Sequence, residues 1–384
     1  MLYFTLFIAL VWGLYACFNL ILAYYWFQIP TIKLRTPNTI QEFPKAFLSV
    51  VIPVRNEAKH LPALLQSLLA QTYPTNKFEV WMVNDHSTDE SVEIIKNFIQ
   101  KHPNFPLHLL HLSSQNLISP KKQALELAIQ HAQGELILTT DGDCVLPKEW
   151  LETINLFYQQ THSPLISSLV TFSAEKDLFQ VLQTIEFASL VGAGAASMQA
   201  GFPTMCNGAN LAYTKQIFAR VNGFEGIKHL ASGDDELLMR KIAKISPQNI
   251  RFLKSSQNIV HTQAQATWKA FFQQRKRWAS KWHAYPDVFS KILAVFIFLS
   301  NALVPFAFFL TLAGIQSWHT FAWQIGLKCG SEYIFLCPVL WFLGKRKHIW
   351  AIPLLQIIYP YYVIFFGIIA NLNTSYEWKN RKLA

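Results

Sequence analysis

The sequence predicts an α/β domain with a mostly parallel sheet, held between one N-terminal transmembrane helix and about three C-terminal ones. Two observations carry this prediction. Apolar runs long enough to cross a bilayer lie near both ends of the 384-residue chain, and short apolar strands alternate with helices between them. The residues are 52% hydrophobic and 15% charged, whereas soluble globular domains are about a quarter charged. This composition excludes a disordered protein and an ordinary soluble enzyme.

The first segment, residues 1–29, is predicted to be a retained membrane anchor. Leu2 to Ile29 is almost wholly apolar and uncharged, and it exceeds the roughly 20 residues needed to cross a bilayer. No basic region precedes it and no A-x-A site ends it, which argues against a cleaved signal peptide. Lys33 and Arg35 follow directly and indicate that this end faces the cytoplasm.

Three further apolar stretches lie within residues 288–372. The middle one is the least typical membrane span because it carries Lys328 and Glu332. The stretches are Ile292–Ile315, Phe321–Leu343 and Ile349–Leu372.

The basic segments around these stretches give conflicting indications of topology. Gly344-Lys-Arg-Lys-His348 is typical of a cytoplasmic loop, but the basic tail 373–384, with Lys379, Arg381 and Lys382, also requires the cytoplasm. Pro353 and Pro360 would permit a re-entrant turn in the last stretch. The prediction is therefore two to four C-terminal spans, with three favoured.

The formal net charge of +10 lies in the C-terminal third of the chain. From Pro30 to Trp268, 20 basic and 20 acidic residues balance, and the surplus begins at Lys269. A nucleic-acid-binding domain would carry basic residues over its folded surface, so we do not expect nucleic acid as a partner. Basic residues beside apolar segments favour anionic lipid headgroups instead, at about 1 kcal/mol per residue.

The central segment 47–268 has the pattern of an α/β domain. In such a domain, ligands bind beyond the carboxyl ends of the parallel strands. We therefore expect functional side chains in the turns that follow the strands. The predicted strands are Phe47–Val54, Phe78–Val83, Leu107–Leu112 and Glu135–Thr140, and the predicted helices are Leu61–Ala70, Ser91–Gln100 and Lys121–Ala132.

Carboxylates follow three of these strands. Glu57 follows the first strand, and Asp85 directly leaves the buried second strand, as a ligand-facing residue would. Asp89 and Ser91 are interpreted as helix caps. The fourth strand runs into Asp141-Gly-Asp143, where two carboxylates at i and i+2 can point toward one cation. Hard oxygen ligands select Mg²⁺ or Mn²⁺, and a metal held by so few carboxylates completes its shell with substrate phosphates.

Two more clusters lie later in the chain. Ser232-Gly-Asp-Asp-Glu236 places three adjacent carboxylates before a helix, where a cap needs one, and the excess indicates metal chemistry or a general base. Within 269–287, Gln274, Arg277 and Trp278 share one face of a predicted helix. The same helix has the basic and aromatic residues of a membrane-interface helix, and both interpretations can hold.

With these motifs, the chain resembles the membrane-bound family 2 glycosyltransferases of the GT-A fold, and is similar to processive polysaccharide synthases and ceramide glucosyltransferases. The resemblance covers about Leu48 to Trp282. Each motif is weak alone, but all six stand in the family's order between an N-terminal anchor and C-terminal spans. They are Val51-Ile-Pro-x-x-Asn-Glu57, Asn84-Asp-x-Ser-Thr-Asp89, Lys121-x-x-Ala-Leu125, Asp141-x-Asp143, Gly233-Asp-Asp235 and Gln274-x-x-Arg-Trp278.

The resemblance implies that the first four motifs bind a nucleotide-diphosphate sugar. Glu57 and Asp85 would contact the nucleoside, and Lys121 would lie near the diphosphate. Asp141 would bind the ribose or the metal-bound phosphate. Asp143 would ligate a divalent metal, Mg²⁺ or Mn²⁺, which bridges the diphosphate and acts as a Lewis acid for the leaving nucleotide.

The resemblance also implies that Gln274, Arg277 and Trp278 close over the donor diphosphate and shape the acceptor entrance. Arginine offers a bidentate phosphate fork that lysine cannot reproduce. The small, apolar segment Ser189 to Phe202 is expected either to face the acceptor or the bilayer, or to be a packed helix.

The catalytic base implied by the resemblance is a carboxylate of the Gly233-Asp-Asp-Glu motif. It would take the proton from the acceptor hydroxyl as that oxygen attacks the anomeric carbon in line. Asp234 is favoured, because the family's base lies three residues before the leucine that corresponds to Leu237. Gly233 stands where the family usually has an acid, so Asp235 remains an alternative.

The leading hypothesis is an inverting, metal-dependent glycosyltransferase that acts on a lipid or lipid-linked glycan at the cytoplasmic face of a membrane. We expect a multi-pass protein of a bacterial inner membrane. Uridine diphosphate sugars are the family's commonest donors. However, Asn84 and Ser119-Pro120 replace residues usual in the family, and they leave the nucleotide and the sugar open.

Two other functions are weighed against this hypothesis. A processive polysaccharide synthase is disfavoured because the few predicted spans leave little material for a channel. A non-catalytic membrane scaffold is disfavoured because the acidic residues that a relic would lose are all present, namely Asp85, Asp141, Asp143 and Asp234. The sequence leaves the acceptor and the oligomeric state undetermined.

Overall fold

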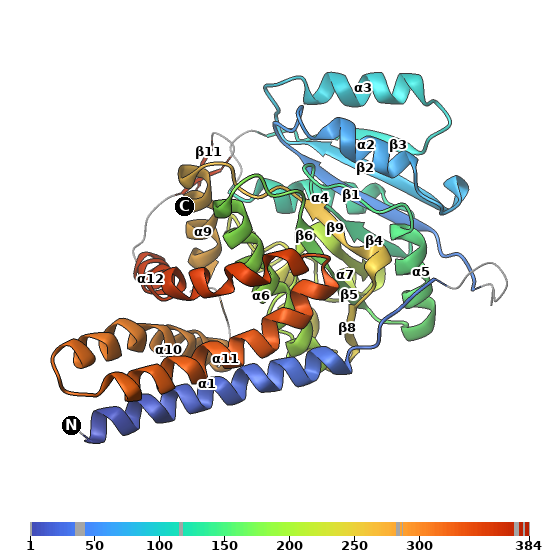
Figure 1. Ribbon diagram of the computed structural model, residues 1–384. Helices are drawn as coiled ribbons and strands as arrows, with labels where there is room; N and C mark the ends of the chain where they lie inside the picture. The colour runs from blue at the N-terminus through green and yellow to red at the C-terminus, as the bar shows by residue number, and fades with distance from the viewer. Residues whose placement is uncertain are drawn as a thin grey trace. The chain divides into compact units, whose positions relative to one another are not determined.

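The computed structural model describes residues 2–34, 43–114, 118–281, 285, 287–371, 376–378 and 381–383 (Figure 1). The chain forms two compact units. The sheet unit contains Ile29–Ala174, Ser197–Ala264 and Glu377–Ala384, and the helical unit contains Met1–Gln28, Glu175–Ala196 and Gln265–Tyr376. Arg35, Trp282 and Lys379, which entered the sequence-based predictions, lie outside the described residues.

The sheet unit is built on a seven-stranded sheet in the order β3-β2-β1-β4-β7-β5-β8. Strand β7 (Leu211–Thr214) runs antiparallel to β4 and to β5 (Leu165–Ser168), and β8 (Ile250–Leu253) runs parallel to β5. A small second sheet pairs β6 (Val170–Phe172) with β9 (Val260–Thr262). The parallel strands predicted from the sequence are confirmed as β1 (Leu48–Val54), β2 (Phe78–Asn84), β3 (Leu107–His111) and β4 (Leu136–Thr139).

Strand β1 lies between β2 and β4, which explains its continuous apolar sequence. Its residues Val50, Val51 and Ile52 are fully buried, as expected for a parallel strand covered on both faces. Gly134 leads into β4, and its N–H donates to Ser49 Oγ at 2.7 Å. A Cβ at this position would lie 2.5 Å from Ser49, so the close approach requires glycine.

The helices of the sheet unit follow the strands as the sequence predicts. Helices α2 (Leu61–Leu69), α3 (Ser91–Lys101) and α4 (Pro120–His131) correspond to the three predicted ones. The other helical elements are α5 (Trp150–Thr161), α7 (Lys215–Arg220), α8 (Glu236–Ala243), and the 3₁₀ turns η2 (Thr75–Lys77), η3 (Gly208–Asn210), η4 (Pro247–Asn249) and η5 (Ser256–Asn258). Close to the C-terminus, β10 (Tyr376–Trp378) and β11 (Arg381–Leu383) pair with each other.

The described residues include five helical segments that are long and apolar enough to cross a membrane. Four confirm the predicted apolar helices, one N-terminal and three C-terminal. The fifth is α6 (Leu178–Gln199), which contains most of the segment whose role the sequence left open. The other four are α1 (Leu2–Gln28), α10 (Val288–Leu312), α11 (Trp318–Phe342) and the segment Arg346–Ala370, formed by η7 (Arg346–Ala351) and α12 (Ile352–Ala370).

Two expectations for these helices are resolved by the structure. Helix α6 is closely packed, because a Cβ on its Gly192 would lie 2.8 Å from Val339 of α11. The suggested re-entrant turn is wrong, since α12 is continuous from Ile352 to Ala370. Pro353 lies in the first turn, where no intrahelical N–H bond is required, and Pro360 removes one hydrogen bond without ending the helix.

Helices α1 and α11 lie side by side and run in the same direction (Figure 1). Tyr15 donates a hydrogen bond to Glu332 at 2.6 Å, and Trp26 packs against Phe342 further along both helices. Glu332 also forms a 2.7 Å ion pair with Lys328. This buried pair explains how the least typical apolar stretch keeps two opposite charges, because each charge has a partner.

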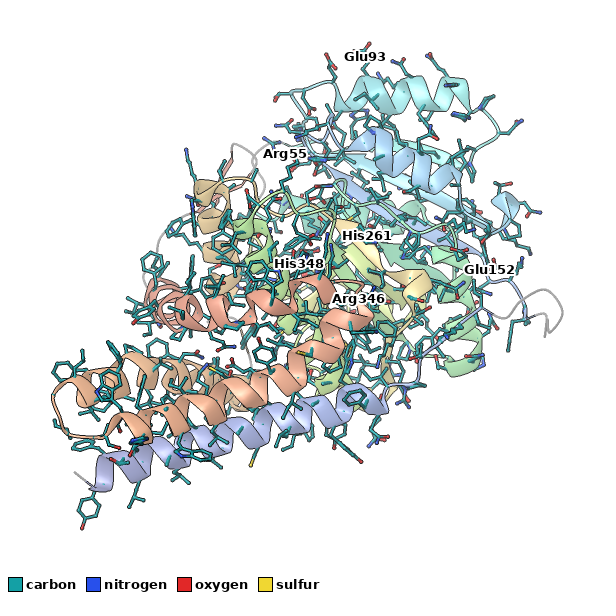
Figure 2. The ribbon with its side chains drawn as sticks, viewed as in Figure 1. Arg55, Glu93, Glu152, His261, Arg346 and His348 are labelled. Carbon is teal, nitrogen blue, oxygen red and sulfur yellow. The ribbon has the colours of Figure 1, made fainter. Side chains whose placement is uncertain are left out.

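The basic loop after α11 is only partly available to lipid headgroups. Lys345 and His348, the latter labelled in Figure 2, are buried. Their nitrogens lie 2.6 and 3.0 Å from the carboxylate of Glu175. Burial alone would raise the pKa of Glu175, but hydrogen bonds from Lys345, Thr184 and His348 hold that pKa below its usual value. The other two basic residues of this loop, Arg346 and Lys347, are exposed.

Replacing Lys328 by Met should lower the free energy of unfolding by about 3–5 kcal/mol, because Glu332 would keep a buried charge without its cation. The double variant Lys328→Met/Glu332→Leu should recover most of that loss. Unfolding of the purified protein in detergent, followed by circular dichroism, measures both. Equal stability of the single and double variants would contradict the pairing.

Candidate functional site

Two turns at the carboxyl ends of β1 and β2 are fastened to each other. Arg55, at the end of β1, donates to the carbonyl oxygen of Asp85 at 2.7 Å (Figure 2). Asn56 and His86 have left-handed backbone, with φ of 50° and 51°, a strained conformation that is common in binding sites. Further bonds join Asn56 N to Ser87 Oγ, Thr88 N to Asn56 Oδ1, Glu57 N to Ser91 Oγ, and Ala58 N to Asp89 Oδ2.

The two predicted nucleoside-binding carboxylates belong to these turns. Asp85 is 2% exposed, and its Oδ1 lies 3.2 Å from His86 Nδ1 and 3.8 Å from Arg55 Nη1. Glu57 is also buried and lies against Gly142, where a Cβ would be 2.8 Å from Glu57 Cγ. The glycine in the middle of the Asp141-Gly-Asp143 motif therefore makes room for Glu57.

Asp141 and Asp143 follow β4 and have different partners. Asp141 Oδ1 lies 2.8 Å from the ammonium of Lys121, and its side chain is 35% exposed. Asp143 Oδ2 accepts a hydrogen bond from Thr262 of β9 at 3.1 Å. The next residue, Cys144, is buried. Burial and the charges of Asp143 and Asp141 raise the pKa of its thiol, so this sulfur stays protonated.

Lys121 also reaches the later acidic cluster. Its ammonium lies 3.1 Å from Asp234 Oδ2, so one cation joins Asp141 and Asp234. Burial would lower the pKa of Lys121, but Asp141, Asp234 and Asp235 together raise it above its usual value. The lysine therefore remains charged. Gly208 lies beside Asp234 and Lys121, because a Cβ at position 208 would be 3.4 Å from Asp234 Oδ2 and 3.5 Å from Lys121 Nζ.

Asp235 has contacts typical of a structural carboxylate. Its Oδ1 accepts from Glu236 N at 2.7 Å as the cap of α8, and its Oδ2 accepts from Gly208 N at 3.0 Å. Glu236 pairs with Arg240 at 2.9 Å. Asp234, the first of the three adjacent acids, has the ammonium of Lys121 as its partner.

The carboxylates after β4 fit a divalent cation that binds with a phosphate ligand. Among the described residues, no group of three or more His, Cys, Asp or Glu side chains could hold a metal ion. Asp141 and Asp143 nevertheless offer hard oxygen atoms, which Mg²⁺ and Mn²⁺ prefer, and Mg²⁺ is commonly bound through one or two carboxylates plus substrate phosphates.

The remaining motif lies in the helical unit, on α9 (Trp268–Ala279). Arg275 is 2% exposed and pairs with Glu186 of α6. Gln274 accepts a hydrogen bond from Arg275, and the ring of Trp278 lies 4.3 Å from the Arg275 guanidinium carbon. Arg277 differs, because no described carboxylate pairs with it and its buried Nε has no hydrogen-bond partner within the described residues.

Thus the structure brings Lys121, Asp141 and Asp234 together, with Asp235 beside Gly208 and Glu57 beside Gly142. Sequence reasoning assigned no contact in the site to several neighbours, because their side chains are not acidic. Tyr213 is one, since burial and then Asp234 raise its pKa. The others are Gly208, Thr262, Ser119 and Lys122.

Comparison with known proteins places the chain in a family. The sequence profile described as Glycosyl transferase family 21 matches residues 3–384. The Glycosyltransferase AglE of Haloferax volcanii is 28% identical over 202 residues, which are 49% of this chain and 59% of that protein. The Probable glycosyltransferase YdaM of Bacillus subtilis is 27% identical over 322 residues, 80% of this chain and 73% of its own length. The chain therefore matches less than two thirds of the first relative.

A solved structure gives the same architecture. The mannosyltransferase PcManGT from Pyrobaculum calidifontis, in complex with GDP-Man and Mn²⁺, has 18% sequence identity and a TM-score of 0.53. The match covers 91% of this chain and 99% of that one. The likeness shows a GT-A type fold, as the sequence predicts.

The contacts of the two aspartates predict different costs of substitution. Asp235→Asn leaves one oxygen for two backbone N–H groups, so unfolding should become easier by about 1–2 kcal/mol. Asp234→Asn should change stability by less than about 0.5 kcal/mol, because its partner Lys121 keeps Asp141. Thermal unfolding of the two variants measures this difference, and a larger loss for Asp234→Asn would contradict it.

Proposed function

Because the chain belongs to glycosyl transferase family 21, we propose that it transfers a sugar from a nucleotide-diphosphate donor to a hydroxyl group of a membrane-held acceptor, with inversion. The observation that carries this proposal is the contact of Lys121 with both Asp141 and Asp234. This contact supports the proposal, because one cation then lies beside both a carboxylate proposed for the donor diphosphate and the proposed base.

In the proposed reaction, Asp234 acts as the general base. Its Oδ takes the proton of the acceptor hydroxyl while the acceptor oxygen forms a bond to the anomeric carbon. The bond from that carbon to the diphosphate oxygen breaks on the opposite side, and its electron pair leaves with the nucleotide. The contacts of Asp235 with Gly208 N and Glu236 N support Asp234 as the base, because Asp235 is engaged in holding the backbone.

The donor is proposed to lie along the carboxyl ends of β1, β2 and β4. Glu57 and Asp85 serve the nucleoside, and Lys121 stabilises the negative charge that develops on the diphosphate. Asp141 and Asp143 would hold Mg²⁺ or Mn²⁺, which when bound supplies Lewis-acid stabilisation of the leaving group. The default donor is a uridine diphosphate sugar.

We assign Arg277 to the diphosphate as well, with Gln274 and Trp278 in support. Two observations favour this: the guanidinium of Arg277 lacks a carboxylate partner among the described residues, and Gln274 and Trp278 instead hold the neighbouring Arg275. The proposal keeps the predicted boundaries, with an anchor at 1–29, the transferase domain at 47–268, the interface helix at 269–287 and spans within 288–372.

We place the reaction at the cytoplasmic face of a bacterial inner membrane, on a lipid or lipid-linked glycan acceptor. The parallel direction of α1 and α11 supports this orientation. Basic residues follow the C-terminal end of each helix, after Ile29 and after Leu343, so both basic segments would lie on the same side of the membrane.

Asp143→Ala and Asp234→Asn should each reduce sugar transfer by at least about 10³-fold, because each removes a group required in the transition state. The assay incubates purified membranes with a panel of nucleotide sugars and Mg²⁺ or Mn²⁺ and identifies the product by mass spectrometry. Membrane insertion should be unchanged in both variants. Full activity of either variant would overturn the mechanism, and a long polymer as product would favour a processive synthase.

Substitution of Arg277 should affect activity, whereas substitution of Arg275 should affect stability. Arg277→Ala should lower kcat/KM by about 10²-fold with little change in stability, because its buried Nε has no hydrogen-bond partner within the described residues. Arg275→Met should lower stability by about 3 kcal/mol or more, because it leaves Glu186 buried without its cation. Transfer kinetics and thermal unfolding of both variants test this. An unfolded Arg277→Ala would contradict the assignment.

A further inference from the structure

The first turn of α4 is attached to the chain segment that leads into Asp234. Ser119 Oγ donates to the carbonyl oxygen of Lys228 at 2.7 Å. The ammonium of Lys122 donates to the carbonyl oxygens of Leu230 at 2.5 Å and of Ser232 at 2.7 Å. Both donor residues are buried, with exposed fractions of 0% for Ser119 and 1% for Lys122.

These contacts constrain the backbone of residues 228–232. A buried ammonium is costly unless several acceptors surround it, so the two carbonyls must converge on Lys122 for the fold to keep it there. The segment then turns at Gly233, whose φ is +82°, and whose Cβ would lie 2.8 Å from Leu237. A side chain is therefore excluded at Gly233, and the next residue is Asp234.

We propose that Lys122 and Ser119 are positioning residues for the catalytic base: they fix the 228–232 backbone so that the Asp234 carboxylate is held at the reacting hydroxyl. This rests on the proposed function, in which Asp234 is that base. Lys121, one residue earlier, holds the carboxylates of Asp141 and Asp234. One helical turn thereby sets the distance between the donor side and the base.

Such positioning has a measurable effect on rate. A displacement of about 1 Å in a reacting group can cost about 10²-fold in rate without loss of binding. Lys122 binds the carbonyl oxygens of Leu230 and Ser232, which precede Asp234, and the turns at Glu57 and Asp85 are held by Ser91 and Arg55. Loss of Lys122 should therefore act on kcat, whereas a general loss of folding would lower binding and rate together.

The sheet unit offers a matched control lysine. Lys215 on α7 donates to the carbonyl oxygen of Ala132 at 2.5 Å, so it also holds a backbone carbonyl, but at the opposite end of α4 from Lys121. Lys215→Met and Lys122→Met remove the same chemical group. Only Lys122→Met removes a contact to the segment before Asp234.

The experiment compares Lys122→Met, Lys215→Met and the milder Ser119→Ala in the full-length, detergent-purified protein. We expect Lys122→Met to lower kcat by about 30- to 100-fold with the donor KM and the Kd for the free nucleotide changed by less than about threefold. Ser119→Ala should lower kcat by about 3- to 10-fold in the same pattern. Lys215→Met should keep kcat within about twofold.

A second readout does not depend on activity. The side chain of Lys228 is 40% exposed, so trypsin can report on its segment. Cleavage after Lys228 should become faster in Lys122→Met and Ser119→Ala and stay unchanged in Lys215→Met. Unchanged cleavage together with unchanged kcat in Ser119→Ala and Lys122→Met would overturn the proposal, as would a parallel loss of kcat and nucleotide binding in all three variants.

The outcome separates this inference from the proposed function. If Asp234→Asn retains transfer, the assignment of the base fails, whatever Lys122 does. If Asp234→Asn is inactive but Lys122→Met keeps normal kcat and normal cleavage, the positioning role alone is wrong.

Discussion

The arrangement of the candidate site depends on one electrostatic constraint: several carboxylates lie close together, and each needs a compensating group. The ammonium of Lys121 lies between Asp141 and Asp234. Asp235 accepts two backbone N–H groups, and Glu236 is paired with Arg240. Like charges placed close together repel one another unless cations or N–H groups compensate them. Asp234 therefore shares its cation with Asp141, and the two carboxylates are held close together by one ammonium.

The same rule governs the helical unit, where charges are buried among apolar helices. Lys328 pairs with Glu332, Arg275 with Glu186, and Lys345 with Glu175. Two of these acids precede Trp268, in the part of the sequence whose charges balance when counted along the chain. A count by sequence segment therefore overstates the basic charge that the C-terminal third can offer to lipid headgroups, since part of it is neutralised by α6 and the residues just before it.

The strand and helix order could be predicted from the sequence because it depends on local apolar periodicity, and β1, β2, β3 and β4 lie within two residues of their predicted bounds. The antiparallel direction of β7 could not be predicted, because it is set by pairing with β4 and β5, which are distant in the sequence. For the site, acidic motifs identified Asp141 and Asp234. The contacts of Lys122, Ser119 and Thr262 could not be predicted, because they are made to backbone carbonyls or to an aspartate distant in the sequence.

The glycine at position 233 shows how a departure from a family pattern can be compensated elsewhere. By sequence, Gly233 in place of the usual acid left the identity of the base open. In the structure, its φ of +82° turns the chain directly after the carbonyl of Ser232, which Lys122 binds. A further acid there would add a charge to a cluster in which Lys121 already serves two carboxylates. Gly233 thus adds no further negative charge beside Asp234, and the buried ammonium of Lys122 holds the carbonyl group of Ser232.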